Sequence, residues 1–376
     1  MKKIKVMSVF GTRPEAVKMC PLVLELQSRP EITSCVTLTG QHRSMLDSVM
    51  DEFGLTADYD LHIMRENQTP TTIAADVMLG LDEILKKEKP DIVLVHGDTT
   101  TSFASALTAF HLMIPVGHVE AGLRTYDKYS PFPEEMNRTL TGRIATLHFS
   151  PTEKNKNNLL SEGVPESAIY VTGNTVIDTF KYTVTENYRF HSEALSDFDF
   201  NGCRTVVLTA HRRENQSGGI ESICRAVLRL AKKYKDVKFI YPVHLSPAVR
   251  NTVFPILSGH EDDGVFLTDP LDLFDMHNLI KRSYMVLTDS GGIQEEAPSL
   301  GSPVLVLRTE TERPEAVSAG TVKVIGTDED DIVRETSKLL DSGDEYAKMA
   351  HSVNPYGDGF ASKRIADAII SYFSQS

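Results

Sequence analysis

The sequence predicts an α/β protein of two domains, each a doubly wound parallel sheet, and three observations lead to this prediction. Short β-branched runs alternate with longer amphipathic stretches along nearly the whole chain. The candidate strands are almost continuously apolar, which is typical of a parallel sheet covered by helices on both faces. The alternation breaks once, over residues 181–203, and then restarts. At ~150 residues per domain, a length of 376 residues also fits two domains.

The first domain is expected to span residues 1–180. Pro14 suits the first turn of a helix, because its missing N–H would have no partner there. The candidate strands are rich in Val and Ile and cover residues 4–10, 34–40, 91–97, 114–120 and 168–173. The candidate helices cover residues 14–29, 43–53, 69–88, 99–111 and 152–161.

The second domain is expected to span residues 181–361, beginning with a connector of mixed aromatic and charged residues. A last helix, at about 362–376, is expected to fold back over one of the two domains, and the first domain is one of the two candidates. The candidate strands cover residues 205–211, 237–244, 264–268, 284–290, 302–308 and 321–326, with helical patterns at 218–234 and 328–341.

The composition argues against several classes of protein. Lys and Arg number 39 against 52 Asp and Glu, and the formal charge of −13 argues against a nucleic-acid binder, which needs a basic surface. The cysteines are widely spaced and form no Cys-x-x-Cys pair, so neither a disulfide scaffold nor a zinc site is indicated. The apolar run at the start is too short for a signal peptide, and no apolar run of about 18 residues follows. We therefore expect a cytoplasmic protein without a membrane segment.

Polar clusters follow many of the predicted strands, which is where parallel sheets bind ligands. The first strand leads into Gly11, and a helix with Arg13 and Lys18 follows. A glycine turn into a helix N-terminus beside two cations suits an anionic group. The turn is neither Gly-x-Gly-x-x-Gly nor a Walker loop, so it indicates neither dinucleotide binding nor nucleoside triphosphate hydrolysis. The alternative is a tight turn with solvated charges.

Carboxylates gather after two further strands of the first domain. One strand ends in His-Gly-Asp-Thr-Thr, with Asp98, and the next ends in His-Val-Glu-Ala-Gly-Leu-Arg, with Glu120. Period-two alternation places each carboxylate on the same face as the histidine two residues before it, while the strand lasts. A proline-stiffened loop then adds Glu134 and Glu135. We expect these groups to lie at one edge of the sheet.

Three interpretations of the carboxylates are open. Clustered carboxylates push each other's pKa values apart, which suits general acid–base catalysis. His-x-Asp and His-x-Glu can also ligate a metal, although the spacing specifies none. The structural alternative is that Asp98 caps a helix and Glu120 pairs with Arg124. Three carboxylates at one predicted cleft favour the catalytic interpretation.

The second domain shows the pattern of a nucleoside diphosphate site. After the strand at 284–290, a Ser-Gly-Gly turn opens into a helix and presents backbone N–H groups to an anion. Glu296, farther along that helix, is placed to accept hydrogen bonds from a ribose diol. His211 follows another strand beside two arginines and is placed to serve a leaving phosphate. Arg313 is a further candidate for a phosphate.

Eight segments carry a specific resemblance. FGTRPEAVK, HGDTTT, GHVEAGLRT, SPFPEEMNR, GNTVID, TAHRREN, TDSGGIQEEAPSLG and TERPEA resemble the signatures of the non-hydrolysing UDP-N-acetylglucosamine 2-epimerases, nearly end to end and in the family's order. The resemblance implies two Rossmann-like domains in the B-type glycosyltransferase architecture, with the sugar nucleotide in the interdomain cleft. The implied reaction interconverts UDP-GlcNAc and UDP-ManNAc, normally to supply ManNAc for bacterial surface polysaccharide or teichoic-acid linkage.

The chemistry of this reaction explains the residue types. The C2 hydrogen is not acidic until the C1–O bond to UDP breaks, so we expect inversion to proceed by elimination of UDP and re-addition across a 2-acetamidoglucal. This scheme requires no metal and no nicotinamide cofactor, and which carboxylate is base and which is acid stays open. By motif matching, the resemblance implies catalytic roles for Asp98, Glu120, Glu134 and His211, and UDP-sugar contacts for Arg13, Lys18, Ser290, Gly291, Gly292, Glu296 and Arg313.

The resemblance also implies a homodimer and, as in some bacterial members, a second UDP-GlcNAc bound as an effector. The chain departs from those relatives at Ser44 and Asn67, where they carry Gln and Arg, so we expect the effector site to persist but to be weakened. Leu271 and Met276 replace Gln and Phe on the uracil side, and we expect both changes to be tolerated. The matching effector contacts are Gln41, His42, Gln68, Glu134, Arg212 and His244.

Three other functions are alternatives to a non-hydrolysing epimerase. A UDP-sugar-dependent glycosyltransferase of the same architecture would hold UDP similarly, but it needs one base rather than three acid–base groups. A non-catalytic sugar-nucleotide sensor would not need intact carboxylates. A hydrolysing epimerase, which releases free ManNAc, often carries a fused kinase domain, and no residues remain here to form one.

Overall fold

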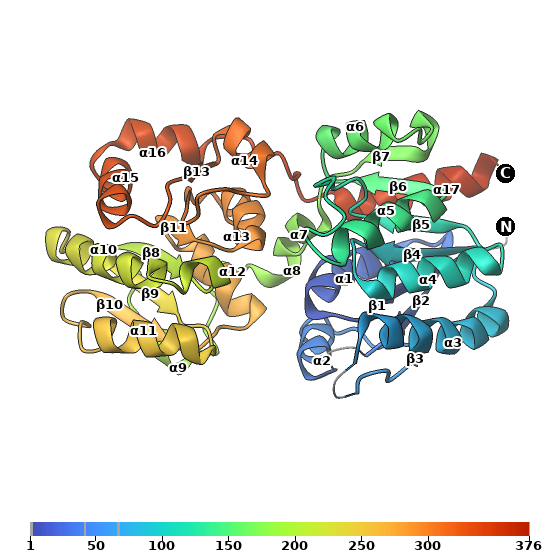
Figure 1. Cartoon of the computed structure of the whole chain (residues 1–376), viewed down its shortest axis with the longest axis horizontal. Helices are drawn as coiled ribbons and strands as arrows, with labels where there is room; N and C mark the ends of the chain where they lie inside the picture. The colour runs from blue at the N-terminus through green and yellow to red at the C-terminus, as the bar shows by residue number, and fades with distance from the viewer. Residues whose placement is uncertain (1–2, 41–42, 66–67, 376) are drawn as a thin grey trace. The chain divides into compact units, whose positions relative to one another are not determined.

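The computed structural model describes residues 3–40, 43–65 and 68–375, and the chain divides into two compact units. Unit 1 comprises residues 1–182 together with 356–376, and unit 2 comprises residues 183–355. Each unit is built around one parallel sheet with helices packed on its faces (Figure 1). The predicted fold class of two doubly wound parallel sheets is confirmed.

Unit 1 holds a seven-stranded sheet in the order β3-β2-β1-β4-β5-β6-β7, paired in parallel throughout. The sequence analysis missed β3 and β6, because β3 has two residues and the four residues of β6, Leu-His-Phe-Ser, form no continuous apolar run. The strands are β1 (Ile4–Phe10), β2 (Ile32–Leu38), β3 (Tyr59–Asp60), β4 (Ile92–His96), β5 (Val116–Val119), β6 (Leu147–Ser150) and β7 (Ile169–Val171).

Helices cover this sheet, and the C-terminal one belongs to the same unit. The backbone N–H groups of Ala361 and Ser362 donate to the Asp178 carboxylate at 3.1 and 2.9 Å, which joins the last helix to α7. The helices are α1 (Arg13–Ser28), α2 (Arg43–Glu52), α3 (Pro70–Glu88), α4 (Thr100–His111), α5 (Glu134–Ile144), α6 (Glu153–Ser161), α7 (Thr175–Asp178), α8 (Phe180–Thr183, which ends one residue into unit 2) and α17 (Ala361–Gln375).

Unit 2 holds a six-stranded parallel sheet in the order β10-β9-β8-β11-β12-β13. Its strands are β8 (Arg204–Thr209), β9 (Val237–Pro242), β10 (Val265–Thr268), β11 (Met285–Thr288), β12 (Val304–Val306) and β13 (Val322–Val324). Its helices are α9 (Glu193–Ser196), α10 (Gly219–Lys233), α11 (Pro247–Leu257), α12 (Leu273–Lys281), α13 (Gly291–Glu296), α14 (Pro314–Ala319), α15 (Glu329–Asp341) and α16 (Gly343–Ala350).

The strand order places the polar clusters at the switch points of the two sheets. In unit 1 the order reverses between β1 and β4, and in unit 2 it reverses between β8 and β11. Parallel sheets bind ligands at such points, beyond the carboxyl ends of the strands. Arg13 begins the helix after β1, and the turns after the other three strands contain Asp98, His211 and Ser290.

Among the residues that the structure describes, no helix is long and apolar enough to cross a membrane.

Candidate active site

The turn after β1 is held by a buried carboxylate that the sequence analysis did not assign. Glu15 is 2% exposed, and its Oε2 accepts the backbone N–H groups of Gly11 and Thr12 at 3.0 and 2.8 Å. Its Oε1 accepts the hydroxyls of Thr99 and Ser102 at 2.7 and 3.0 Å. Glu15 therefore fastens the β1–α1 turn to the β4–α4 turn.

The carboxylate of Glu120 has several polar neighbours in unit 1. Glu120 follows β5 with a φ of 62°, in the left-handed region that non-glycine residues rarely adopt. Its Oε2 forms an ion pair with Lys18 and accepts the Asn174 side-chain N–H at 2.9 Å. His96 Nε2 lies 3.7 Å from the same oxygen, and burial lowers the pKa of His96. A strained backbone whose side chain has several polar partners is typical of a functional residue.

Asp98 is held by helix α5. Arg138 forms an ion pair with its carboxylate, and Asn137 Nδ2 donates to its main-chain carbonyl at 3.0 Å. Burial raises the pKa of Asp98, although the Arg138 guanidinium opposes this shift. Because α5 begins at Glu134, the same helix carries one predicted catalytic carboxylate and positions another.

The structure corrects one prediction about Glu134 and Glu135. These residues are not in a proline-stiffened loop, because Pro133 is the N-cap and α5 runs through Ile144. Glu135 accepts the backbone N–H groups of Thr125 and Tyr126 at 3.0 and 2.9 Å, so it is a structural residue. Helix α5 was not predicted because it is largely polar and has few apolar residues that could show a helical period.

The structural alternative for the carboxylates is wrong. Arg124 pairs with Glu162, at 2.7 and 2.9 Å, and not with Glu120. The N-cap of α4 is Thr99 and not Asp98.

His118, two residues before Glu120, does not lie next to the Glu120 carboxylate. The strand ends at Val119, and His118 Nε2 lies 2.7 Å from the Gly97 carbonyl oxygen instead. Burial lowers the pKa of His118 to about 3. It is therefore neutral near pH 7 and structural, whereas His96 is the histidine near Glu120.

In unit 2 a second buried carboxylate organises the turn after β8. Asp289 is 0% exposed, and its Oδ2 accepts the backbone N–H groups of His211 and Arg212, both at 2.8 Å. Its Oδ1 lies 3.6 Å from His211 Nδ1, and the His211 ring stacks on His244 at 5.1 Å between centroids. Burial lowers the pKa of His211, while Asp289 opposes this shift.

The Ser-Gly-Gly turn opens into α13 as predicted, with Ser290 as the N-cap. A Cβ added to Gly291 would lie 3.6 Å from Arg212 Nη2, so the Arg212 guanidinium is next to this turn. A Cβ on Gly292 would lie 3.3 Å from Glu296 Oε1, which places that carboxylate at the same turn. Unit 2 thus brings a cation, a helix N-terminus and a carboxylate together.

Other predicted residues have different surroundings. Arg313 forms an ion pair with the buried Glu295. Gln68 is bound within its own loop, because its Nε2 donates to the Ile63 carbonyl at 2.6 Å. Gln41, His42 and Asn67, and the side chain of Ser44, are outside the described residues.

Among the described residues, one cluster has the residue types of a metal site, formed by His191, Asp272 and Asp275. Its atoms already have partners, since His191 Nδ1 lies 2.8 Å from Asp272 Oδ2 and Asp275 accepts the Tyr188 hydroxyl at 2.9 Å. The cluster is therefore explained by structure, and it lies apart in sequence from the predicted catalytic residues.

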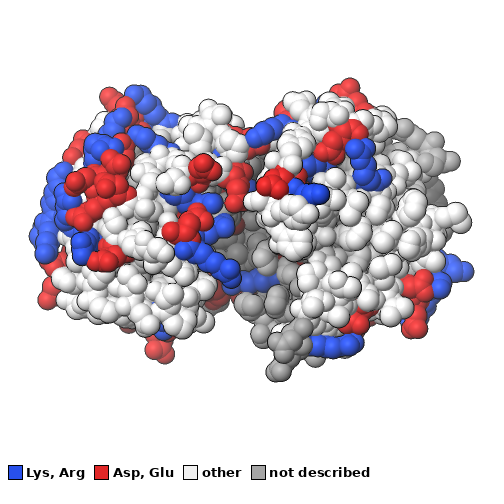
Figure 2. Space-filling view, viewed as in Figure 1, with Lys and Arg blue, Asp and Glu red and all other residues white. Residues whose placement is uncertain are grey.

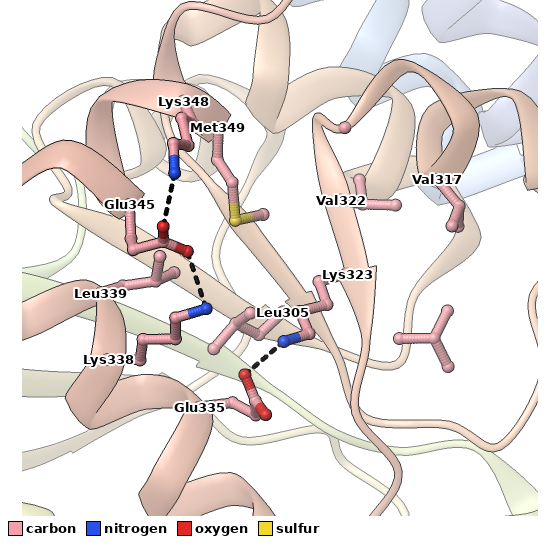
Figure 3. Close-up of a pocket in the computed structure, with 12 residues that line it drawn as sticks. Leu305, Val317, Val322, Lys323, Glu335, Lys338, Leu339, Glu345, Lys348 and Met349 are labelled. Carbon is pink, nitrogen blue, oxygen red and sulfur yellow. Dashed lines mark hydrogen bonds and ion pairs between the residues drawn. The ribbon is translucent and has the colours of Figure 1, made fainter. Parts of the chain in front are cut away.

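A cavity of about 360 Å³ also lies in unit 2, over the edge strand β13 (Figure 3). Figure 3 shows that its basic side chains already meet acidic ones: Lys323 pairs with Glu335, and Glu345 lies 2.7 Å from both Lys338 and Lys348. None of its lining residues is among those predicted to bind a sugar nucleotide, so the switch-point turns remain the candidate site.

Comparison with known proteins decides the family. The family model of UDP-N-acetylglucosamine 2-epimerase matches residues 24–370. The UDP-N-acetylglucosamine 2-epimerase of Bacillus subtilis (strain 168) is 53% identical over 373 residues, covering 99% of this chain and 97% of that protein. This chain belongs to the UDP-N-acetylglucosamine 2-epimerase family. The prediction of an epimerase, an isomerase, is thereby confirmed.

Solved structures agree with this assignment. A UDP-GlcNAc 2-epimerase from Neisseria meningitidis, solved with UDP-GlcNAc bound, is 49% identical, with a TM-score of 0.86, covering 98% of this chain and 100% of that one. The glycotransferase of kitacinnamycin, at 10% identity and a TM-score of 0.68 over 99% of both chains, shares the fold. This chain therefore has the two-domain Rossmann-like fold of that glycotransferase, as predicted.

Sequence reasoning missed four residues of this epimerase-family chain that hold either a predicted catalytic group or a turn of the candidate site. They are Asn174 at Glu120, Arg138 at Asp98, Glu15 at the first turn and Asp289 at His211. Each of the four lies in a segment that carries the family resemblance. The motifs therefore located these residues near the site, but they did not show which side chain each residue contacts.

Proposed function

We propose that this chain reversibly epimerises UDP-GlcNAc at C2 to UDP-ManNAc by eliminating UDP and adding it back across a 2-acetamidoglucal. Glu120 is the main support for the proposal, because its carboxylate is held by Lys18 and Asn174 and its backbone is strained, with His96 Nε2 3.7 Å from the carboxylate. Family membership and the UDP-GlcNAc bound to the Neisseria relative support the substrate. In the cell, the reaction would take place in the cytoplasm and supply ManNAc for surface polysaccharide or teichoic-acid linkage.

In this scheme the carboxylates of unit 1 move the proton at C2. Breakage of the C1–O bond builds positive charge at C1, and only then is the C2 proton removable. One carboxylate takes this proton, and another group delivers a proton to the opposite face of the glucal as UDP returns. The cation Lys18 favours the ionised form of Glu120, whereas at Asp98 the effect of burial outweighs that of Arg138. Burial of Asp98 raises its pKa, which favours the protonated form that a donor needs. Glu134 is the third candidate.

In the same scheme unit 2 retains UDP. The N-terminal turn of α13, at Ser290, Gly291 and Gly292, offers backbone N–H groups to the diphosphate, and Arg212 lies beside that turn. His211 assists the departing diphosphate, and Glu296 accepts hydrogen bonds from the ribose. We also assign substrate contacts to Arg13, Lys18 and Arg313. Neither a metal nor a nicotinamide is needed in this chemistry.

The experiment that tests the proposal follows the proton at C2. The enzyme is incubated with UDP-GlcNAc alone in D₂O, and the sugar nucleotides are analysed by proton NMR. We expect UDP-ManNAc that carries deuterium at C2, because the proton is exchanged through groups in contact with solvent. UDP-ManNAc without deuterium would contradict the elimination route, and the absence of UDP-ManNAc would contradict the activity.

We further propose a weakened effector site for a second UDP-GlcNAc, with Gln68, Arg212 and His244 among its contacts. Asn67 in place of an arginine removes a charge-assisted contact, typically ~1.5–3 kcal/mol, or roughly one to two decades in affinity. The reaction from UDP-ManNAc alone is expected to start with a lag that only high UDP-GlcNAc abolishes. A full initial rate without UDP-GlcNAc would show that no effector is required.

We also propose a homodimer formed through helices α3, α4 and α5 of unit 1. Helix α4 carries no Lys, Arg, Asp or Glu, and Figure 2 shows a broad area without charged residues on the face of unit 1 that it draws. Large apolar side chains are exposed on or next to these helices, namely Leu79 on α3 at 73%, Phe110 on α4 at 58% and Met113 just after α4 at 91%. Sedimentation equilibrium tests this directly, since a monomeric mass at micromolar concentration would contradict the dimer.

A further inference from the structure

A buried histidine links the nucleotide site of unit 2 to the point where the chain enters that unit. The side chain of His277, on α12, is 0% exposed. Its Nδ1 lies 2.8 Å from Thr183 Oγ1, and its Nε2 lies 3.4 Å from Glu296 Oε2. Thr183 is the first residue of unit 2. The ring therefore stands between the connecting segment and the carboxylate proposed to bind the ribose.

The partners of His277 decide which ring nitrogen carries the proton. A neutral imidazole has one N–H donor and one acceptor nitrogen. An ionised carboxylate accepts hydrogen bonds and donates none, so the nitrogen that faces Glu296, Nε2, carries the proton. Nδ1 is then the acceptor, and the Thr183 hydroxyl donates to it. The contacts run from the Thr183 hydroxyl, through a hydrogen bond of 2.8 Å to His277, to Glu296, which lies 3.4 Å from Nε2, beyond the usual length of a hydrogen bond.

Thr183 is held in place independently of the His277 ring. Asn278, the next residue on α12, donates from Nδ2 to the Thr183 carbonyl at 2.6 Å. Its Oδ1 accepts the Thr185 backbone N–H at 3.2 Å. Because these bonds fix the backbone around Thr183, its hydroxyl is directed at His277 with little freedom.

The two oxygens of Glu296 have different surroundings. Oε2 faces His277, whereas Oε1 lies over the N-terminal turn of α13, where a Cβ on Gly292 would be 3.3 Å away. One oxygen is therefore oriented by the protein interior, and the other is presented at the turn proposed to hold UDP. This division suits a carboxylate that must keep one orientation to accept from a ligand hydroxyl.

We propose that His277 is a positioning residue: its Nε2–H orients the Glu296 carboxylate for the ribose of UDP, and Thr183 fixes the ring tautomer. The inference rests on the proposed function, since it takes the ribose as the ligand of Glu296. It assigns to the nucleotide site two residues that reach the ligand only through Glu296.

The test compares the affinities of the full-length protein for UDP and 2′-deoxy-UDP, measured by calorimetry. The wild type is expected to prefer UDP by ~10-fold or more, since a hydroxyl bound to a carboxylate makes a charge-assisted hydrogen bond. His277→Leu, which removes the donor, is expected to lower this preference to about 3-fold or less. His277→Gln is expected to restore most of it, because its amide nitrogen offers a donor in a similar place. Thr183→Val is expected to lower it by about 3-fold.

Thr179→Val is the matched control. Thr179 is also buried, 0% exposed, and its hydroxyl donates to the Val17 carbonyl at 3.0 Å. Its replacement is expected to leave the preference for UDP unchanged, even where it lowers the melting temperature. If His277→Leu does not fold, the Gln and Val variants decide the result.

Failure of the inference differs from failure of the proposed function. A preference for UDP that stays at the wild-type value in both His277→Leu and Thr183→Val would overturn the inference and leave UDP binding intact. Equal affinities of the wild type for the two nucleotides would overturn both the inference and the ribose role of Glu296. A wild-type protein that binds neither nucleotide would contradict the proposed function itself.

Discussion

Replacing Glu120 by glutamine is expected to lower the turnover number with UDP-GlcNAc by ~10²-fold or more, the usual scale of acid–base catalysis. The amide keeps the size of the side chain but is neither a base nor a source of negative charge beside Lys18. Asp98→Asn and Glu134→Gln are expected to act on the same scale. Glu296→Gln is expected to raise KM with a smaller effect on turnover, since it is placed for the ribose. Steady-state rates by NMR or a coupled assay measure each effect.

Glu162→Gln is the matched control for this series. Glu162 is a carboxylate of the same unit, paired with Arg124, and its side chain is 16% exposed against 11% for Glu120. Its replacement is expected to lower stability without a ~10²-fold loss of turnover. A Glu120→Gln enzyme with wild-type turnover would remove Glu120 from the catalytic residues, whatever happens at Glu162.

Replacing Gly122 by alanine is expected to destabilise unit 1 by ~3 kcal/mol or more, two residues after Glu120. Gly122 has a φ of 94°, and a Cβ there would lie 2.3 Å from the backbone oxygen of Asn155. Backbone cannot move aside as a flexible side chain does. The Gly122 carbonyl also accepts from Asn158 Nδ2 at 2.9 Å, which holds it in this position. Urea unfolding, followed by circular dichroism, measures the loss in free energy of unfolding.

Gly163→Ala separates the two causes of this effect. Gly163 also has a positive φ, 84°, but a Cβ there would meet nothing within 4 Å. Its replacement is expected to cost only the ~1–2 kcal/mol of left-handed backbone. If the two alanine variants lose the same free energy of unfolding, close contact with Asn155 does not contribute and the argument for Gly122 is wrong.

Much of this protein is determined by local patterns in its sequence. Continuous apolar runs at 4–10 and 91–97 predicted β1 and β4 within one residue, because a strand buried on both faces tolerates few polar side chains. The turns at Gly11 and at Ser290 were also predictable, since strand, turn and helix are adjacent there. The family resemblance depends on the same short segments. Helix α5 escaped prediction because its polar sequence shows little apolar periodicity.

Only the tertiary structure decided how the candidate catalytic groups are held. Lys18 and Glu120 are 102 residues apart, and Arg138 and Asp98 are 40 apart. These partners meet because β1, β4 and β5 are neighbours in one parallel sheet and α5 is anchored to the turn after β4. A charged side chain in a short segment could pair with several oppositely charged residues, as the incorrect pairing of Glu120 with Arg124 illustrates. Strand order and helix placement select one of them, and they depend on the packing of the whole unit.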